Sequence, residues 1–199
     1  MPTGELNLEG VTWQGPPFES SPNLSALPHP LANLLEQING FILWEGALHV
    51  RGLCTHPDWH SLHIASEIFR QYDAVEEGDV VFAQDCVGDQ FVYRHSGIYR
   101  LLAETGDIEH LADDLTEFLR AATTHPMTVL GLHPLLQLRE QSQQLQPGQL
   151  IMAYPPFCTE QAAAGVSLKP VASHEVIHFH LALASNVHDG DQFHVEIVD

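Results

Sequence analysis

The first regular pattern of hydrophobic positions predicts a helix from about Pro28 to Ile38. Four apolar residues recur at the spacing that places side chains on one face of a helix: Leu31, Leu34, Leu35 and Ile38. A proline is tolerated in a first helical turn, and Asn39-Gly40 is a typical stop. Residues 1–26 are rich in Pro, Gly, Ser and Asn, so we expect an irregular lead-in before this helix.

Alternation with a period of two predicts strands in the middle of the chain. Phe41–Leu53 has the pattern of one or two short strands, in which Leu48 and Val50 alternate with His49 and Arg51. Three further strands are expected at Asp79–Gln84, Gln90–Arg94 and Gly97–Glu104. Because short turns with Gly88-Asp89 and Ser96-Gly97 join them, we expect an antiparallel meander.

Two more helices are predicted on either side of this meander. One runs from Trp59 to about Tyr72 with Asp58 as its cap, and the other from Asp113 to Thr123. The acidic pair Asp113-Asp114 fits a helix start, where the helix dipole favours negative charge.

A change of composition at Thr123–Pro126 predicts a boundary between an α+β domain, residues 1–125, and an extension, residues 126–199. The extension is expected to have a helix at Met127–Gln146 and strands at Gly148–Tyr154, Gly165–Val171, Glu175–Leu183 and Gln192–Val198. The last two strands would form a long-looped hairpin, and the extension could be a small sheet of its own or could add strands to the first one. The predicted fold class is α+β, with a mixed or antiparallel sheet, flanking helices and a C-terminal extension of helix and strands.

The net charge of the chain disfavours some classes of binding partner and favours others. The chain of 199 residues has 7 Lys and Arg against 26 Asp and Glu, which gives a net charge of −19. Such a surface repels the phosphates of nucleic acids and anionic membranes. It attracts basic proteins and accelerates their encounter.

The cysteines and the N-terminus predict a cytoplasmic protein. Cys54, Cys86 and Cys158 are odd in number and contain no C-x-x-C pair, which favours thiols in a reducing compartment. The N-terminal residues lack the basic start and the apolar core of a signal peptide. No apolar run reaches the roughly 18 residues of a membrane span.

His174-Glu175-Val176-Ile177-His178 matches the H-E-x-x-H signature of zinc proteases. That chemistry needs a helix, which places both imidazoles on one face. The alternation of Ile177, Phe179, Leu181 and Leu183 with the residues between them instead predicts a strand here. In a strand the two histidines would lie roughly 13 Å apart, too far to share a zinc ion. Glu196 is the one late candidate for a third ligand.

Other candidate chemistry is weak. Cys54, His56, His60 and His63 could approach a metal, but Pro57-Asp58 indicates that the helix begins after His56, and a polar helix face explains the pattern better. Ser96 lacks the first glycine of a nucleophile elbow, and the carboxylates beside Cys86 disfavour a thiolate. We therefore predict no catalytic residues, no metal site and no cofactor.

The first part of the chain resembles the SUKH superfamily, which includes regulators of yeast cell-wall synthesis and many bacterial immunity proteins. The resemblance covers Leu27 to Ala121 and rests on motifs in the same order: Leu27-Pro28-His29-Pro30-Leu31, Ile38-Asn39-Gly40, Val81-Phe82-Ala83-Gln84-Asp85, Gly88-Asp89-Gln90-Phe91-Val92, Gly97-Ile98-Tyr99, Glu104-Thr105-Gly106 and Asp114-Leu115-Thr116-Glu117-Phe118-Leu119. It implies an α+β fold and no enzymatic activity. Many bacterial members neutralise toxins by binding them.

Charge and resemblance together predict a cytoplasmic immunity protein that neutralises a basic toxin domain by direct binding. One alternative is a regulatory or scaffold module in cell-wall or envelope synthesis, as the eukaryotic relatives suggest. Another is a zinc hydrolase that uses His174, Glu175 and His178. The acidic residues predicted to contact the partner are Asp85, Asp89, Glu104, Asp107, Asp113 and Asp114, which lie on turns and at a helix start.

Overall fold

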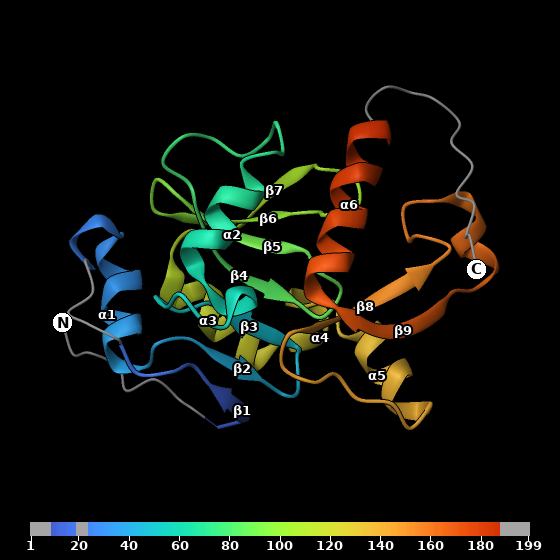
Figure 1. The fold of residues 1–199 in the computed structure, drawn as a ribbon, viewed down its shortest axis with the longest axis horizontal. Helices are drawn as coiled ribbons and strands as arrows, with labels where there is room; N and C mark the ends of the chain where they lie inside the picture. The colour runs from blue at the N-terminus through green and yellow to red at the C-terminus, as the bar shows by residue number, and fades with distance from the viewer. Residues whose placement is uncertain (1–8, 19–23, 188–199) are drawn as a thin grey trace.

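The computed structural model describes residues 9–18 and 24–187, which form a sheet with helices on both faces (Figure 1). The strands are β1 (Val11–Gln14), β2 (Phe41–Leu43), β3 (Leu48–Val50), β4 (Val80–Asp85), β5 (Gln90–Arg94), β6 (Gly97–Leu101), β7 (Ile108–Ala112), β8 (Gln149–Tyr154) and β9 (Ser167–Ala172). The α-helices are α1 (His29–Gln37), α2 (Leu62–Phe69), α3 (Leu115–Thr124), α4 (Pro126–Val129), α5 (His133–Glu140) and α6 (Ser173–Val187). Short 3-10 helices are η1 (Leu24–Ala26), η2 (Asp58–His60) and η3 (Glu160–Ala164).

The main sheet is an antiparallel meander of seven strands in the order β1-β2-β3-β4-β5-β6-β7. This confirms the predicted α+β class and the predicted meander. Strands β1 and β7 were not predicted. The sequence predicted an irregular lead-in at the position of β1 and no strand at the position of β7. Strands β8 and β9 form a separate antiparallel pair.

Helices cover the sheet on both sides. Apolar side chains of α1, α3 and α5 pack with one face of the sheet, including Phe82 and Phe118. Helices α2 and α6 cover the other face, where Phe69 and Val176 pack with Val81 and Val92. Figure 1 shows α2 and α6 in front of the strands and α3 behind them.

The helix predicted at Pro28–Ile38 is confirmed as α1. The second predicted helix begins later than expected, because Asp58–His60 form a 3-10 turn. Helix α2 therefore starts after Ser61, whose side chain accepts a hydrogen bond from the Ile64 N–H group.

Residues 126–187 differ most from their prediction. The single helix expected at Met127–Gln146 is two short helices, α4 and α5, separated at Gly131, which has a positive φ of 57°. Side chains of α5 and β8 belong to the same apolar core as the first strands, and the Ile151 N–H group donates to the carbonyl of Cys86, 2.8 Å away. The predicted boundary at residue 125 therefore lies within a shared core.

The strand predicted at Glu175–Leu183 is wrong, because this segment lies in α6. Its buried residues follow a helical period rather than a period of two: Val176, Ile177, His180, Leu183 and Ala184. This face of α6 packs on the sheet with α2. The other half of the expected hairpin, Gln192–Val198, lies outside the described residues.

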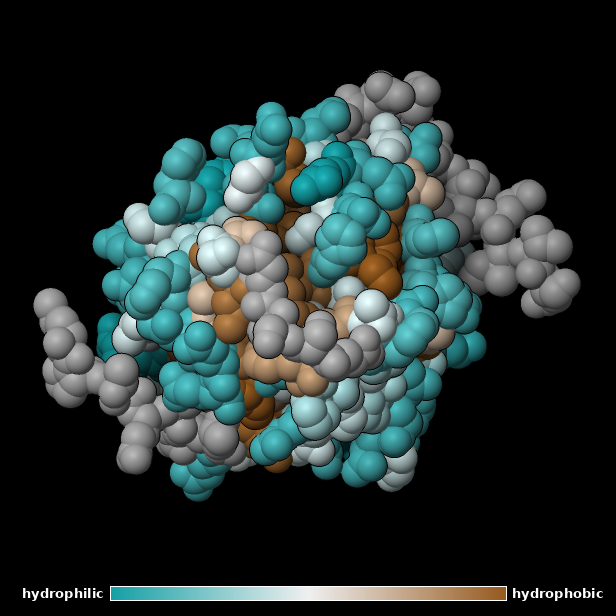
Figure 2. All heavy atoms as spheres, turned by 60° about the vertical axis from the view of Figure 1, so that its left-hand side comes forward, coloured by the Kyte–Doolittle hydropathy of each residue, from teal (hydrophilic) through white to brown (hydrophobic). Residues whose placement is uncertain are grey.

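Hydrophilic residues surround a central hydrophobic band on the molecular face of Figure 2. Within residues 9–18 and 24–187, no helix is long and apolar enough to cross a membrane.

Asp114 closes the N-terminal end of α3 with its side chain. Its Oδ1 accepts a hydrogen bond of 2.8 Å from the Glu117 N–H group, and the Glu117 carboxylate accepts one of 3.0 Å from the Asp113 N–H group. These bonds satisfy backbone donors that the first turn of a helix leaves without partners.

We expect Asp114→Ala to lower the free energy of unfolding by about 1 kcal/mol, because it removes this cap. Urea denaturation followed by circular dichroism measures the change. Asp113→Ala is the matched control, since the Asp113 side chain is 88% exposed and does not cap the helix. Equal stabilities of the two variants would show that the cap contributes nothing.

Candidate functional site

A row of cross-strand neighbours places polar side chains on the sheet face that α2 and α6 cover. Along this row His49 of β3 pairs with Gln84 of β4, and Gln84 pairs with Gln90 of β5. The row continues on the other side through Ile42 to Trp13 at the edge. His49, Gln84 and Gln90 are all buried, so each must find hydrogen-bond partners inside the protein.

Those partners form one continuous chain that ends at a backbone carbonyl. The carbonyl of Asn39 lies 3.0 Å from His60 Nε2, and because a carbonyl only accepts, Nε2 carries the proton. In a neutral ring His60 Nδ1 then accepts from His49 Nε2, 2.8 Å away. His49 Nδ1 in turn accepts from the Gln84 amide at 3.3 Å. Both imidazoles are therefore neutral.

The electrostatic environment agrees with this assignment. Burial lowers the pKa of His60 to about 4, although its bond to Asn39 acts in the opposite direction. Burial, followed by the charge of Arg51, holds the pKa of His49 well below its usual value. A proton on either ring would break the chain of donors and acceptors.

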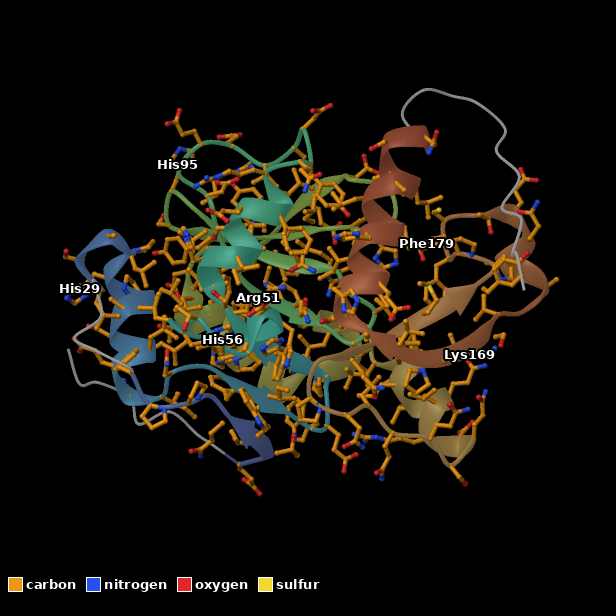
Figure 3. All side chains as sticks on the ribbon, in the orientation of Figure 1. His29, Arg51, His56, His95, Lys169 and Phe179 are labelled. Carbon is orange, nitrogen blue, oxygen red and sulfur yellow. The ribbon has the colours of Figure 1, made fainter. Side chains whose placement is uncertain are left out.

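Arg51 closes the other end of this chain. Its guanidinium is 1% exposed and donates to the side-chain oxygens of Gln84 and Gln90, at 2.6 Å and 2.7 Å. It also lies over the ring of Phe69, 5.5 Å from the ring centre, a favourable cation–π contact. Burial lowers the pKa of Arg51 to about 9. Figure 3 shows Arg51 in the middle of the molecule, close to α2.

Glycines make room for the ring of His60. A Cβ atom on Gly15 would lie 1.9 Å from the carbonyl oxygen of Asn39, and one on Gly52 would lie 2.3 Å from it. A Cβ on Gly40 would lie 2.4 Å from His60 Cε1. The backbone can approach the His60–Asn39 bond this closely only because these residues have no side chain.

The turn between β4 and β5 is built around Asp85. Its Oδ1 accepts hydrogen bonds of 3.0 Å from the N–H groups of Val87, Gly88 and Asp89. Burial and then the charge of Asp89 raise the pKa of Asp85 well above its usual value. Asp89 accepts from the Ala103 N–H group at 2.9 Å, and burial also raises its pKa.

A second cluster joins the buried His180 of α6, Glu104 in the turn after β6 and the exposed Cys158. Glu104 accepts a hydrogen bond of 2.7 Å from the Cys158 N–H group, and its other carboxylate oxygen lies 3.9 Å from His180 Nε2. His180 is 4% exposed, its Nδ1 has no hydrogen-bond partner within the described residues, and burial lowers its pKa to about 4. Burial, followed by the charge of Glu104, raises the pKa of Cys158 to about 11. A thiol in this setting stays protonated and is a poor nucleophile.

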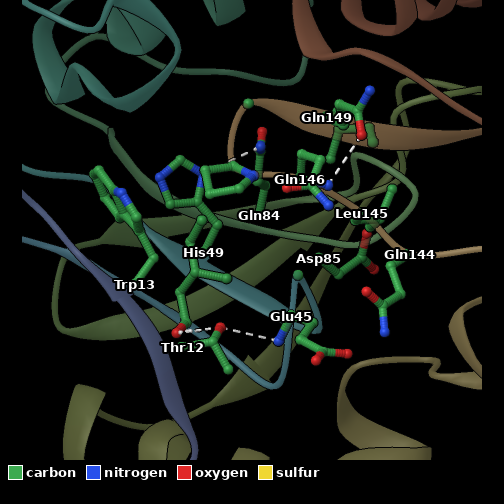
Figure 4. A pocket seen from close by; sticks show the side chains of 15 residues that line it. Thr12, Trp13, Glu45, His49, Gln84, Asp85, Gln144, Leu145, Gln146 and Gln149 are labelled. Atoms are coloured by element: carbon green, nitrogen blue, oxygen red, sulfur yellow. Dashed lines mark hydrogen bonds between the residues drawn. The ribbon is translucent and has the colours of Figure 1, made fainter.

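A cavity of about 270 Å³ opens over the outer part of the polar row (Figure 4). Trp13, Ile42, His49 and Gln84 form its floor, and the segment from Gln144 to Leu150 forms one wall. The carboxylates of Glu45 and Asp85 also line it. This cavity is the candidate site that the sequence did not predict. Its floor depends on strand pairing, and its wall lies where the prediction ends a helix at Gln146 and begins a strand at Gly148.

The six predicted partner-contact residues do not form one surface. Asp85 is 2% exposed, Asp89 accepts a hydrogen bond from the Ala103 N–H group, and Glu104 accepts one from the Cys158 N–H group. Asp107 is exposed where β7 begins, whereas Asp113 and Asp114 are exposed beyond its other end. Strand β7 separates these places by about 17 Å, since a strand rises about 3.4 Å per residue. The buried Asp85 is not part of an exposed surface in this structure, and the contact of the exposed residues with a partner stays a prediction.

The H-E-x-x-H motif lies on helix α6 and not on the predicted strand. The separation of roughly 13 Å expected for its two histidines in a strand therefore does not apply. His174, Glu175 and His178 are exposed on α6. Among the residues that the structure describes, no group of three or more His, Cys, Asp or Glu side chains is arranged to hold a metal ion. The other histidine cluster is also separated: His56 meets Asp58, His63 meets Glu67, and His60 is buried in the network.

Most of the cations are used inside the fold. Arg51 is buried, Arg94 meets Asp79 at 2.7 Å and Arg139 meets Glu45 at 3.1 Å. Arg100 is mostly buried and donates to the carbonyl of Val129. The exposed Lys and Arg residues are Arg70, Arg120 and Lys169, and Figure 3 shows Lys169 at the periphery. Asp79, Asp85 and Glu104 are also mostly buried, so the described surface keeps the excess of carboxylates that the composition indicates.

Comparison with known proteins shows the fold and no more. No family model matches the sequence, and no curated protein matches it. The crystal structure of Atu4351 from Agrobacterium tumefaciens is similar, with a TM-score of 0.58 over 89% of this chain and 87% of that chain, at 10% sequence identity. A likeness at this identity supports a shared fold and says nothing of a shared activity. The resemblance to the SUKH superfamily stays a prediction.

Gly52→Ala should lower the free energy of unfolding by at least about 2 kcal/mol, because the new methyl group overlaps the Asn39 carbonyl and the His60 ring. Gly97→Ala is the control: its Cβ would meet nothing nearer than 3.2 Å, so we expect a smaller loss. Urea denaturation of the three proteins measures both values. A Gly52→Ala protein as stable as the parent would contradict the described packing around His60.

The buried His180 should make stability fall in mild acid. An unfolded histidine takes up a proton near pH 6.5, whereas folded His180 stays neutral down to about 4. The unfolded state therefore binds more protons between these values, and the free energy of unfolding falls as the pH falls, by up to about 1.4 kcal/mol per pH unit. Asp85 and Asp89, whose pKa values are raised, act in the opposite direction, and both remain in a His180 variant.

We expect His180→Leu to lose less stability than the parent protein between pH 6.5 and 5. Urea denaturation at several pH values measures the two slopes. His174→Leu, at an exposed position of the same helix, should keep the parental slope. Parallel slopes for parent and His180→Leu would rule out a buried neutral His180.

Proposed function

We propose that this protein is a non-enzymatic binding protein that neutralises a basic protein partner, in the manner of an immunity protein that occludes a toxin domain. The observation that carries the proposal is the distribution of charge. Four of its cations, Arg51, Arg94, Arg100 and Arg139, are committed to internal contacts. The surface of the described residues is left with a large excess of carboxylates.

The exposed carboxylates lie on several elements, so the field of the protein is negative over much of its surface. They include Glu36, Asp58, Glu67, Asp73, Glu76, Glu77, Asp107, Glu109, Asp113, Asp114, Glu140, Glu160 and Glu175. Such a field speeds the approach of a basic protein and disfavours acidic competitors. The resemblance to the SUKH superfamily supports the same proposal, because many of its bacterial members bind toxins.

One concave acidic surface on the α2 and α6 side suits a large partner. A groove of about 630 Å³ lies between the end of α2, the turn before β7 and α6. Its rim carries Asp73 and Asp107, and its lining includes Tyr72, Ile108 and Leu181. An apolar centre with a polar rim is typical of a protein interface, and here the rim is acidic.

The first experiment is an affinity capture of the tagged protein from its native host at moderate salt, followed by mass spectrometry. The proposal expects one basic protein, retained in stoichiometric amount, whose toxicity is relieved when the two are produced together. Association measured with the purified pair should slow steeply as salt is raised. Capture of envelope-synthesis proteins without any toxic partner would overturn the proposal in favour of the regulatory alternative.

Charge reversal then locates the surface. Asp73→Lys with Asp107→Lys should slow association with the captured partner by about ten-fold at low salt. The matched control is Glu36→Lys with Glu160→Lys, which changes the net charge by the same amount at other exposed positions. Unchanged association rates after reversals on every face would refute an acidic binding surface.

A further inference from the structure

The cavity over the outer polar row has a defined floor, wall and rim. Its floor is part of one cross-strand row, from Trp13 through Ile42 and His49 to Gln84. The segment from Gln144 to Leu150 forms its wall. Figure 4 shows Trp13 and His49 on one side of the pocket and Asp85 and Gln144 on the other.

The acidic side chains in the cavity lining are the carboxyl groups of Glu45 and Asp85, and the lining includes no Lys or Arg. One of the two, Glu45, also contacts Arg139. The only histidine in the lining is His49, which is held neutral by its bonds to Gln84 and His60. The lining therefore disfavours an anion and favours a cation.

Asp85 is the strongest reason to expect a positive guest. It is buried, and within the described part of the chain it makes no ion pair. Three backbone N–H groups hold its Oδ1, but they bring no net positive charge. The mostly buried Arg100 acts on Asp85 through its charge, yet burial and the charge of Asp89 raise the pKa of Asp85 well above its usual value. A cation in the adjoining cavity would favour the charged form of this carboxyl group.

The aromatic side of the cavity suits a flat cation. Trp13 packs against Trp59 with ring centres 4.9 Å apart, and Trp59 lies 5.2 Å from the ring of His49. Indole is the aromatic ring that attracts cations most strongly, and a planar guanidinium stacks on it. Ile42 and Leu145 also line the cavity and offer apolar contact to a methylene stem.

At the rim of the cavity, a carboxylate and a backbone carbonyl of this chain already bind a guanidinium group. Glu45 contacts the guanidinium of Arg139 at 3.1 Å, and the same guanidinium donates to the carbonyl of Trp44 at 2.7 Å. A carboxylate next to backbone carbonyl groups therefore receives an arginine side chain at the edge of the cavity.

We propose that this cavity receives an arginine side chain of the basic partner, with its guanidinium between Trp13 and the carboxylates of Asp85 and Glu45. This inference rests on the proposed function and names the anchor of that interaction. Deep insertion of one arginine is a typical way for a few residues to supply most of the energy of an interface.

The direct test needs no partner. N-acetyl-arginine N-methylamide is titrated into the full-length protein and followed by tryptophan fluorescence and by the indole N–H signals in nuclear magnetic resonance spectra. We expect saturable binding with Kd on the order of 1 mM, as befits a small ligand, and a shift of the Trp13 signal, which Trp13→Phe identifies.

The citrulline analogue of the same compound is the matched chemical control, because it has the same shape without the charge. We expect it to bind at least about ten-fold more weakly. Equal binding of the two compounds, absence of saturable arginine binding, or a response confined to Trp44 would each overturn the inference. Ethylammonium and putrescine are titrated in the same way. Tighter binding of either amine than of the arginine compound would overturn the inference in favour of a small free cation.

Variants locate the site. Asp85→Asn keeps an oxygen for the backbone N–H groups of its turn, and Glu45→Gln keeps the shape of the rim. Each should weaken arginine binding by about five-fold or more, whereas Glu36→Gln, on the exposed face of α1, should leave it unchanged. If Asp85→Asn does not fold, Glu45→Gln and Trp13→Phe still decide the matter, and unchanged binding in both overturns the inference.

The same variants separate this inference from the proposed function. Once the basic partner is captured, Glu45→Gln and Asp85→Asn should raise its dissociation rate by about ten-fold. A partner that binds both variants as tightly as the parent would leave the proposed function standing and refute the arginine pocket. If the cavity binds the arginine compound but no basic protein partner is captured, the arginine pocket stands and the proposed function is refuted.

Discussion

The structure depends on how a buried guanidinium is satisfied without a carboxylate in contact with it. Arg51 lies at the centre of the sheet face under α2 and donates to two glutamine oxygens. Each glutamine must then turn its oxygen toward Arg51, which leaves the amide of Gln84 facing His49. The order of donors and acceptors is thereby fixed as far as the Asn39 carbonyl. One buried charge thus sets side-chain orientation on three strands and on the turn that precedes α2.

That internal use of arginine also shapes the surface. An arginine that is buried, or paired with a neighbouring carboxylate, contributes little positive potential to solvent. Because Arg51, Arg94 and Arg139 all serve the fold in this way, the carboxylates of the surface have few compensating cations. The core also removes carboxylates from the surface, among them Asp79 and Asp85, so the acidic field follows from the composition of the chain.

The sequence was sufficient where local patterns and tertiary packing agree. Helix α1 and strands β4 to β6 were predicted because their apolar spacing and their turns carry the signal. Strand β7 was missed because its middle residues, Glu109 and His110, are exposed at the sheet edge. Helix α6 was mistaken for a strand because apolar residues alternate along it, although its buried residues recur with a helical period. Which glutamines meet Arg51 depends on strand register, which no local pattern contains.

The cavity and the buried network share the side chains of His49 and Gln84, which limits the groups that are free to bind a guest. His49 uses both ring nitrogens inside the network, and Gln84 uses its oxygen for Arg51 and its amide for His49. Neither group can reorient toward a guest without leaving a buried polar atom without a partner, which is costly. The polar groups on the floor of the cavity are therefore committed to the network, whereas the carboxyl groups of Asp85 and Glu45 line the cavity outside that network. The selectivity for a cation that we propose then rests on these two carboxyl groups, because the residues that bind Arg51 are not free to bind a guest.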